Sequence, residues 1–80
     1  MIPIRKLPMG RSSILVRIDG SSLLRQRLYR YGLTTGALIT RYAVSPRNRG
    51  GVWRQGSLLI ALREKEAARL FCQEEEERYE

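Results

Sequence analysis

The segment from Ser22 to Gly36 constrains the fold more than any other part of the sequence, because its pattern predicts one short helix. Leu24, Leu28 and Tyr31 follow one another at the i, i+4 and i+7 spacing that places side chains on one helical face. We therefore expect this face of the helix to pack on a small core formed by the rest of the chain.

Both ends of this helix are marked in the sequence. Ser21 and Ser22 supply hydroxyl groups that can accept a hydrogen bond from the first turn, as N-cap residues do. Gly32 can adopt the positive φ that closes a helix, and Leu33 can then fold back over the last turn. The predicted helix thus has a start, an apolar face and an end.

The polar side of the predicted helix is basic and also carries an aromatic side chain. Arg25, Gln26, Tyr29 and Arg30 lie on this side, and Arg27 lies near its boundary. A cluster of cations suits an acidic partner. We therefore select Arg25, Arg27, Tyr29 and Arg30 as candidate partner-binding residues.

A strand is predicted before the helix. Ile14, Val16 and Ile18 alternate with Leu15 and Arg17, and glycines lie on both sides of this stretch. Alternation with a period of two is typical of a strand that buries one face. We expect Ile14, Val16 and Ile18 to share one face of this strand, opposite Arg17.

Three more strands are predicted after the helix. Residues 38–44 alternate between two faces, as in a strand. Residues 52–55 and 58–62 flank a Gly-Ser pair and are typical of a hairpin. The predicted order is therefore strand, helix, strand, loop, strand, strand.

The loop at residues 45–51 is rich in turn-forming residues and is basic. It contains Arg47 and Arg49, which we add to the candidate partner-binding residues.

Charge is distributed unevenly along the chain. Twelve of the fifteen lysine and arginine residues lie within residues 1–63, against a single acidic residue, Asp19. Seven of the eight acidic residues lie within residues 64–80. A basic body suits nucleic acid, an anionic membrane surface or an acidic protein surface. The alternative is that arginine serves here only to keep the protein soluble.

The C-terminal part allows two interpretations. Intrinsic propensity favours a helix from Glu64 to about Gln73. The competing interpretation is a short helical turn over Glu64 to Ala67 followed by a closing strand over residues 69–73. The residue pattern leaves both open. Residues 74–80 form an acidic tail that we expect to be disordered, because like charges repel one another.

The residue types exclude several kinds of site. The chain has no histidine, one cysteine and one aspartate, so it cannot assemble a tetrahedral zinc site or a histidine-rich iron site alone. Serine and threonine lack a histidine base, and no nucleotide-binding glycine motif is present. We therefore expect a binding protein that is not an enzyme and has no catalytic residues, no metal site and no cofactor.

The 80-residue length predicts one domain, over residues 1–73, with a small core. Cys72 has no second cysteine to pair with, which fits a reducing cytoplasm and a buried thiol. The N-terminus lacks the apolar run of a secretory signal, and the longest apolar run, residues 58–62, is too short to span a membrane. We expect a soluble, cytoplasmic protein.

Aromatic residues lie among the arginines, where their rings could stack on bases. A small barrel, however, needs large side chains to fill its interior. Tyr31 and Trp53 are therefore expected to pack in or near the core, and Tyr29 is the better candidate for contact with a partner.

With these elements in order, the chain resembles the bacterial ferrous iron transport protein A family, FeoA. The family pattern is a strand ending in glycine, then Leu-x-x-Arg-Leu-x-x-Leu-Gly-Leu-x-Pro-Gly, a strand, a proline-bearing turn, and glycine followed by Leu-Arg and Glu-Ala. The positions that fall into this pattern, within a match over about residues 7–73, are Leu24, Arg27, Leu28, Gly32, Leu33, Gly36, Pro46, Gly56, Leu62, Arg63, Glu66 and Ala67.

The sequence departs from the family pattern at several positions. Thr35 replaces the proline of the turn, Tyr31 replaces a leucine, and the mid-chain loop is basic. One extra residue between Gly56 and Arg63 suggests a β-bulge.

The resemblance implies a mainly β fold, a small SH3-like barrel of about five strands with one short α-helix after the first strand. It also implies the helical turn and closing strand at the C-terminal end. It further implies a cytosolic accessory protein of ferrous iron uptake. Such a protein binds and modulates the membrane GTPase transporter FeoB, beside the membrane and not inserted in it.

Two other functions remain open. A small basic barrel could bind nucleic acid through Arg47, Arg49, Arg54 and Trp53 on the loop and hairpin. The second open function is that of a stand-alone regulatory barrel, like the barrel of iron-dependent repressors of the diphtheria toxin repressor type. The oligomeric state is not encoded in any pattern that we identify.

Overall fold

The computed structural model describes residues 1–45 and 49–74. Its elements in chain order are β1 (Ile2–Pro3), the 3₁₀ helix η1 (Ile4–Lys6), β2 (Ser12–Ile18), α1 (Ser22–Tyr31), β3 (Leu38–Val44), β4 (Gly50–Gln55), β5 (Leu58–Arg63), α2 (Glu64–Ala67) and β6 (Leu70–Cys72). The strands pair in the antiparallel order β1-β6-β2-β3-β4-β5. This is the mainly β, SH3-like barrel that the resemblance implied, with six strands in place of about five.

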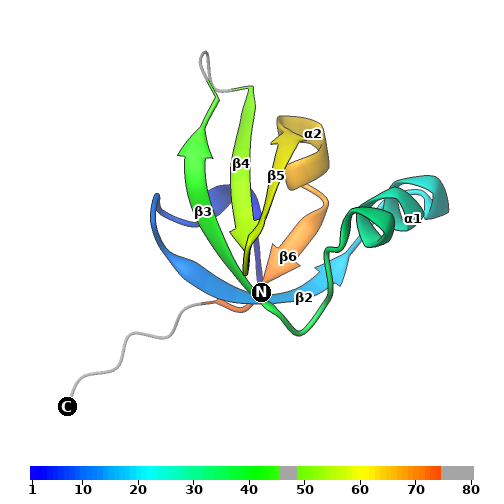
Figure 1. Cartoon of the computed structure of the whole chain (residues 1–80), viewed down its shortest axis with the longest axis horizontal. Coiled ribbons are helices and arrows are strands. Elements are labelled where there is room, and N and C mark those ends of the chain that lie inside the picture. The colour runs from blue at the N-terminus through cyan, green and yellow to red at the C-terminus, as the bar shows by residue number, and fades with distance from the viewer. Residues whose placement is uncertain (46–48, 75–80) are drawn as a thin grey trace.

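The strands curl around a core to which every element contributes a buried apolar side chain or, as Ile2 of β1 does, a partly buried one packed against it (Figure 1). Trp53 of β4 lies inside it with 1% of its surface exposed, which confirms the prediction that this ring packs in the core. The buried apolar residues are Ile4, Leu7, Leu15, Ile18, Leu28, Leu33, Ile39, Trp53, Ile60, Leu62, Ala67, Leu70 and Cys72.

The predicted faces of the first long strand are wrong. In β2, Leu15 is fully buried, whereas Val16 is 37% exposed and Ile14 is half-buried. Leu15 pairs with Cys72 and Arg17 pairs with Phe71, so two steps along β2 correspond to one step along β6. This β-bulge shifts the alternation, because the extra residue turns the side chains that follow it to the other face.

A second register shift lies between Arg41 and Ala43, where β3 pairs with β4. The β4–β5 hairpin is regular, with unbroken pairing from Gly50 opposite Arg63 to Gln55 opposite Leu58. The bulge suggested by the extra residue after Gly56 is therefore absent from β5.

The C-terminal part folds as the short α2 and the closing strand β6, so a single helix to Gln73 is wrong. Leu70 and Cys72 are fully buried on β6, which pairs with β1 on one side and β2 on the other. This strand pairing and burial outweigh the helix propensity of the segment.

The N-terminal segment was not predicted to form structure, yet it closes one end of the barrel. Ile4 of η1 is fully buried and Leu7 is 1% exposed. The Nη1 group of Arg41 donates hydrogen bonds to the carbonyl oxygens of Arg5 and Leu7, each at 2.9 Å, and so holds this segment against β3. The expectations for residues 46–48 and 75–80, Arg47 and most of the acidic tail among them, lie outside the described residues.

Gly51 provides a test of the strand packing. A Cβ atom at this position lies 2.5 Å from the carbonyl oxygen of Ala43, and a backbone atom can move aside only with the strand. We expect Gly51→Ala to lower the free energy of unfolding by about 1–3 kcal/mol or more. Urea denaturation measures this. Ser57→Ala at the exposed hairpin turn is the control and is expected to change it by less than about 0.5 kcal/mol. Equal stability of the two variants contradicts the packing described.

Cys72 provides a test of the core. Its side chain is fully buried, and burial raises the pKa of its thiol. Alkylation requires an exposed thiolate, so the native protein must open before Cys72 reacts. We expect iodoacetamide at about pH 8 to label the folded chain at least roughly 100-fold more slowly than the chain in denaturant. Comparable labelling rates contradict the burial of β6.

Candidate functional site

The candidate site is α1, which projects from one side of the barrel (Figure 1). Its bounds confirm the predicted helix. The Ser21 hydroxyl accepts a hydrogen bond from the Leu24 N–H at 3.1 Å. Gly32 has φ of 109° and caps the other end. The Gly32 and Leu33 N–H groups donate to the carbonyl oxygens of Tyr29 and Leu28, which together form a Schellman motif.

Apolar contacts attach the last turn of α1 to the barrel. Leu28 is fully buried and Leu33 is 1% exposed, while Leu24 is half-buried and packs against the core. Tyr31, which was expected to pack, is 54% exposed. The chain reverses at Gly32, so Leu33 and not Tyr31 reaches the core from the end of the helix.

Gln55, at the end of β4, also holds the end of the helix in place. Its Oε1 accepts from the Thr34 N–H at 3.0 Å, and its Nε2 donates to the Gly32 carbonyl oxygen at 2.9 Å. One side chain therefore binds both a donor and an acceptor of the turn after α1, and the Gly32 carbonyl oxygen also accepts from the Thr34 hydroxyl at 3.2 Å. This contact joins positions more than twenty residues apart and was not predicted.

Two of the candidate arginines also bind within the molecule. The Nη2 group of Arg27 forms an ion pair with Oε2 of Glu66 on α2. Glu66 accepts a further hydrogen bond, from the Arg63 N–H at 2.8 Å, and so caps α2 as well. The Nη1 group of Arg25 donates to the Gly20 carbonyl oxygen at 3.0 Å. Arg27 therefore ties α1 to α2, and Arg25 ties the first half of the helix to the residue before its N-cap.

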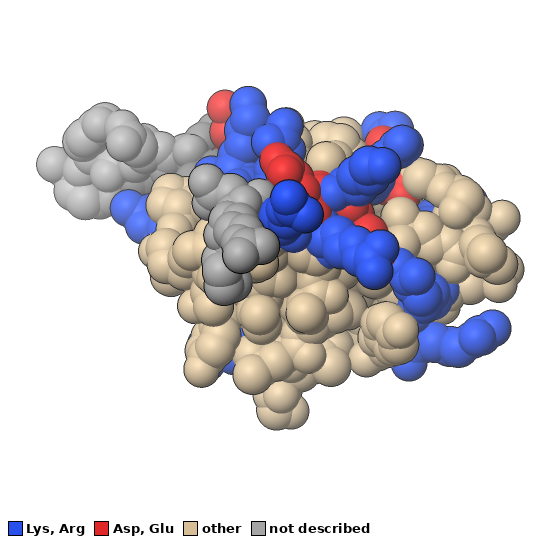
Figure 2. All heavy atoms as spheres, turned by 90° about the horizontal axis from the view of Figure 1, so that it is seen from above, with Lys and Arg blue, Asp and Glu red and all other residues tan. Residues whose placement is uncertain are grey.

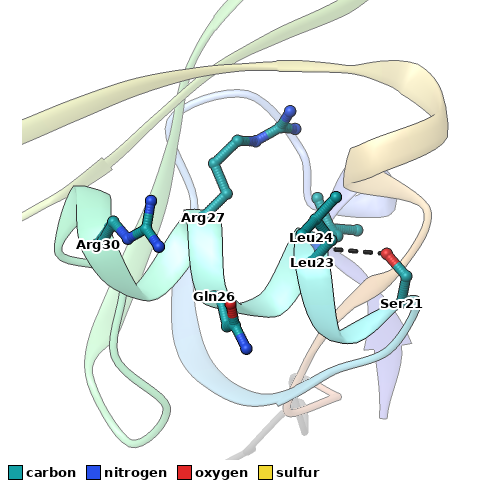
Figure 3. A pocket seen from close by; sticks show the side chains of 6 residues that line it. All are labelled: Ser21, Leu23, Leu24, Gln26, Arg27 and Arg30. Carbon is teal, nitrogen blue, oxygen red and sulfur yellow. Dashed lines mark hydrogen bonds between the residues drawn. The ribbon is translucent and has the colours of Figure 1, made fainter.

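The remaining two candidates on the helix are exposed. Tyr29 is 50% exposed, and Arg30 is exposed with no partner in the described part of the chain. Arg30 and Arg27 belong to a shallow hollow of about 300 Å³ on α1 (Figure 3). Ser21, Leu23, Leu24 and Gln26 complete its lining.

Leu23 is a candidate that the sequence analysis missed. It is 77% exposed, the largest exposed fraction among the exposed large apolar side chains. It lies one turn before Arg27 and two turns before Arg30, so Leu23, Arg27 and Arg30 share one helical ridge. Arginine is enriched at protein interfaces, and the exposed leucine beside it offers apolar area that a partner can bury. We call Leu23, Gln26, Tyr29 and Arg30 the α1 surface.

The charged side chains gather on one side of the molecule. Seen from above, lysines and arginines form a band that runs across the molecule toward the side of α1, with acidic side chains between them (Figure 2). Arg49, just before β4, is exposed, whereas Arg47 lies outside the described residues. Two acids on α2 belong to ion pairs, Glu66 with Arg27 and Glu64 with Arg5 at 3.9 Å.

Within residues 1–45 and 49–74, no three His, Cys, Asp or Glu side chains lie close enough together to hold a metal ion. No helix within the described residues has the length and apolar character needed to cross a bilayer.

Comparison with known proteins identifies the family. The FeoA domain model matches residues 2–74. A crystal structure of an iron uptake regulatory protein, FeoA, shares 30% sequence identity with a TM-score of 0.73, over 86% of this chain and 91% of that one. No curated protein sequence matches the chain.

Two more distant structures share the fold. The FeoA protein of Chlorobium tepidum has 20% identity and a TM-score of 0.81, over 88% of this chain and 67% of that one. A zinc complex of FeoA from Stenotrophomonas maltophilia, described as a prokaryotic SH3 domain protein, has 22% identity and a TM-score of 0.76, over 91% of each chain.

The helix with its glycine cap, the six-stranded barrel and the matched residues lead to one assignment. The chain belongs to the FeoA family.

Proposed function

We propose that this protein is a cytoplasmic accessory of ferrous iron uptake that binds the membrane GTPase transporter FeoB through the α1 surface and modulates it. Membership of the FeoA family supports the iron-uptake role. The FeoA of Stenotrophomonas maltophilia is itself described as a candidate activating factor of ferrous iron transport. The observation that carries the choice of surface is Leu23, a 77% exposed leucine on a helix whose other side is fixed to the barrel.

The chemistry of the α1 surface suits an acidic protein surface with an apolar contact at its centre. Burying Leu23 at an interface removes apolar area from water, which favours association. Arg30 supplies a cation that can form a two-bond contact with a carboxylate. Tyr29 offers a flat ring with a polar tip, at little cost in conformational entropy.

The fixed position of α1 on the barrel also favours binding to a partner. Because Gln55 and the Arg27–Glu66 pair already hold α1 in position, binding needs little further ordering of the backbone. Arg49 extends the cationic surface along the barrel, and Arg47 remains a candidate by sequence.

Nucleic-acid binding, the alternative function, would lack the aromatic contact expected from Trp53. Trp53 is 1% exposed, so its ring is not available to stack on a base. Arg49 and Arg54 are exposed, which leaves attraction to phosphate as the basis for such binding. The stand-alone regulatory barrel has no specific observation in its favour.

Binding to the transporter tests the proposal. We expect Leu23→Ser and Arg30→Glu each to weaken binding to the cytosolic part of FeoB by about tenfold or more, equal to about 1.4 kcal/mol. Isothermal titration calorimetry at low salt measures this. The control is Arg54→Glu, the same charge change at an exposed position on β4, which is expected to bind as the unmodified chain does. Equal losses in Arg30→Glu and Arg54→Glu, with Leu23→Ser binding as the unmodified chain does, indicate a charge effect without a defined surface and contradict the proposal.

A titration with nucleic acid distinguishes the nucleic-acid-binding alternative from the proposed function. We expect gel-shift titration of the intact chain with a short duplex at about 0.15 M salt to give a dissociation constant no tighter than about 10⁻⁵ M. Micromolar or tighter binding supports the nucleic-acid-binding barrel instead, provided that the logarithm of the association constant falls linearly with the logarithm of the salt concentration.

A further inference from the structure

A second hollow lies away from α1, at the end of the barrel where η1, α2, β3 and β4 meet. It has a volume of about 190 Å³. Arg5, Arg41, Trp53 and Glu64 contribute to its lining. The fold and the proposed contact with FeoB leave this hollow without a role.

Arg41 is the half-buried cation of the hollow, and its guanidinium uses only one nitrogen for hydrogen bonds within the chain. Its Nη1 donates to the carbonyl oxygens of Arg5 and Leu7. Its Cζ lies 5.8 Å from the ring centroid of Trp53, so the ring also supports the guanidinium. These contacts fix the guanidinium at one nitrogen. Nε is buried and has no acceptor in the described part of the chain, and both hydrogen bonds described for Arg41 come from Nη1, which leaves the edge formed by Nε and Nη2 for a ligand.

Trp53 adds a second unpartnered donor. Its indole Nε1 is buried and has no acceptor among the described residues. A buried donor left without an acceptor costs about 1–3 kcal/mol. Arg41 and Trp53 both line the same hollow, so an acceptor-only group that enters it offers a partner to these donors.

The charges around the hollow specify the sign of that group. Arg41 forms no ion pair with a carboxylate in the described chain, although a half-buried cation is normally paired. Glu64, the acid that lines the hollow, lies 3.9 Å from Arg5. Both of these side chains are exposed, 43% for Arg5 and 60% for Glu64, so either can move without loss of core packing.

We propose that this hollow binds a carboxylate group. The Nε and Nη2 atoms of Arg41 form the two parallel bonds that a guanidinium edge makes to a carboxylate, and the Trp53 indole supplies a third donor. Arg5 releases Glu64 and adds a second positive charge at the entrance. The carboxylate belongs to an acidic side chain of a protein partner or to a small free acid. The site is independent of the iron-uptake role and of the α1 surface.

Trp53 is the only tryptophan of the chain, so its indole N–H gives a single signal in a nitrogen-15 correlation spectrum. We expect sodium acetate, added to the intact chain at constant ionic strength against sodium chloride, to shift this signal with saturation at roughly millimolar concentration. N-acetylglutamate amide tests the side-chain source, with N-acetylglutamine amide as its uncharged match. Saturation by acetate alone assigns the site to a small free acid, and saturation by both supports a partner's side chain.

Variants tie the signal to the proposed donors. Arg41→Lys cannot make the two-bond contact, so we expect its acetate affinity to fall at least about tenfold. Arg5→Gln removes the second charge at the exposed entrance, with an expected loss of about threefold. If Arg41→Lys does not fold, the acetate affinity of Arg5→Gln alone tests the proposal. Arg54→Gln, next to Trp53 in sequence but exposed on β4, is the control and is expected to bind normally.

A shift that grows linearly without saturation, an equal shift with chloride, or unchanged affinity in both folded variants overturns the proposal. These results indicate instead that water satisfies the two donors.

Discussion

Leu28 and Leu33 lie on either side of Gly32, and the burial of both in the barrel core is the contact on which the position of α1 depends. It requires the chain to reverse at Gly32, with φ of 109°, so that the last helical turn and the residue after it reach the same core. The polar links follow from this placement. Gln55 can reach the turn, and Arg27 can reach Glu66, only because the end of the helix is already fixed. The rest of the helix is left to project and to offer Leu23 and Arg30 outward.

Local patterns predicted the parts of the fold that depend on local contacts. The limits of α1, its caps, β3 and the β4–β5 hairpin all follow from spacing and turn residues near one another in sequence. Features set by distant pairing were missed or misjudged. The faces of β2 depend on a bulge opposite β6, and β6 itself is a strand because it fills the space between β1 and β2. Ile4 and Leu7 carry no periodic signal, so their burial could not be predicted from the N-terminal segment alone.

The candidate site shows the same division. The spacing along α1 predicted that Tyr29 and Arg30 face outward, since helical geometry alone decides this. It could not predict that Arg27 pairs with Glu66, 39 positions later in the sequence. Leu23 was overlooked because it precedes Leu24, and two adjacent leucines give no indication of which one the core accepts. The hollow at Arg41 likewise depends on four elements that meet only in the folded barrel.

We infer that the fixed helix presents one surface to a partner while the barrel holds it in place. Backbone amide signals of the isotope-labelled chain, recorded with and without the cytosolic part of FeoB, test it most directly. We expect the signals of Leu23, Gln26 and Arg30 to broaden or shift most, and those of Leu28, Leu33 and the β4–β5 hairpin to change little. Changes concentrated on the hairpin and the 49–54 segment, with α1 unaffected, would contradict it.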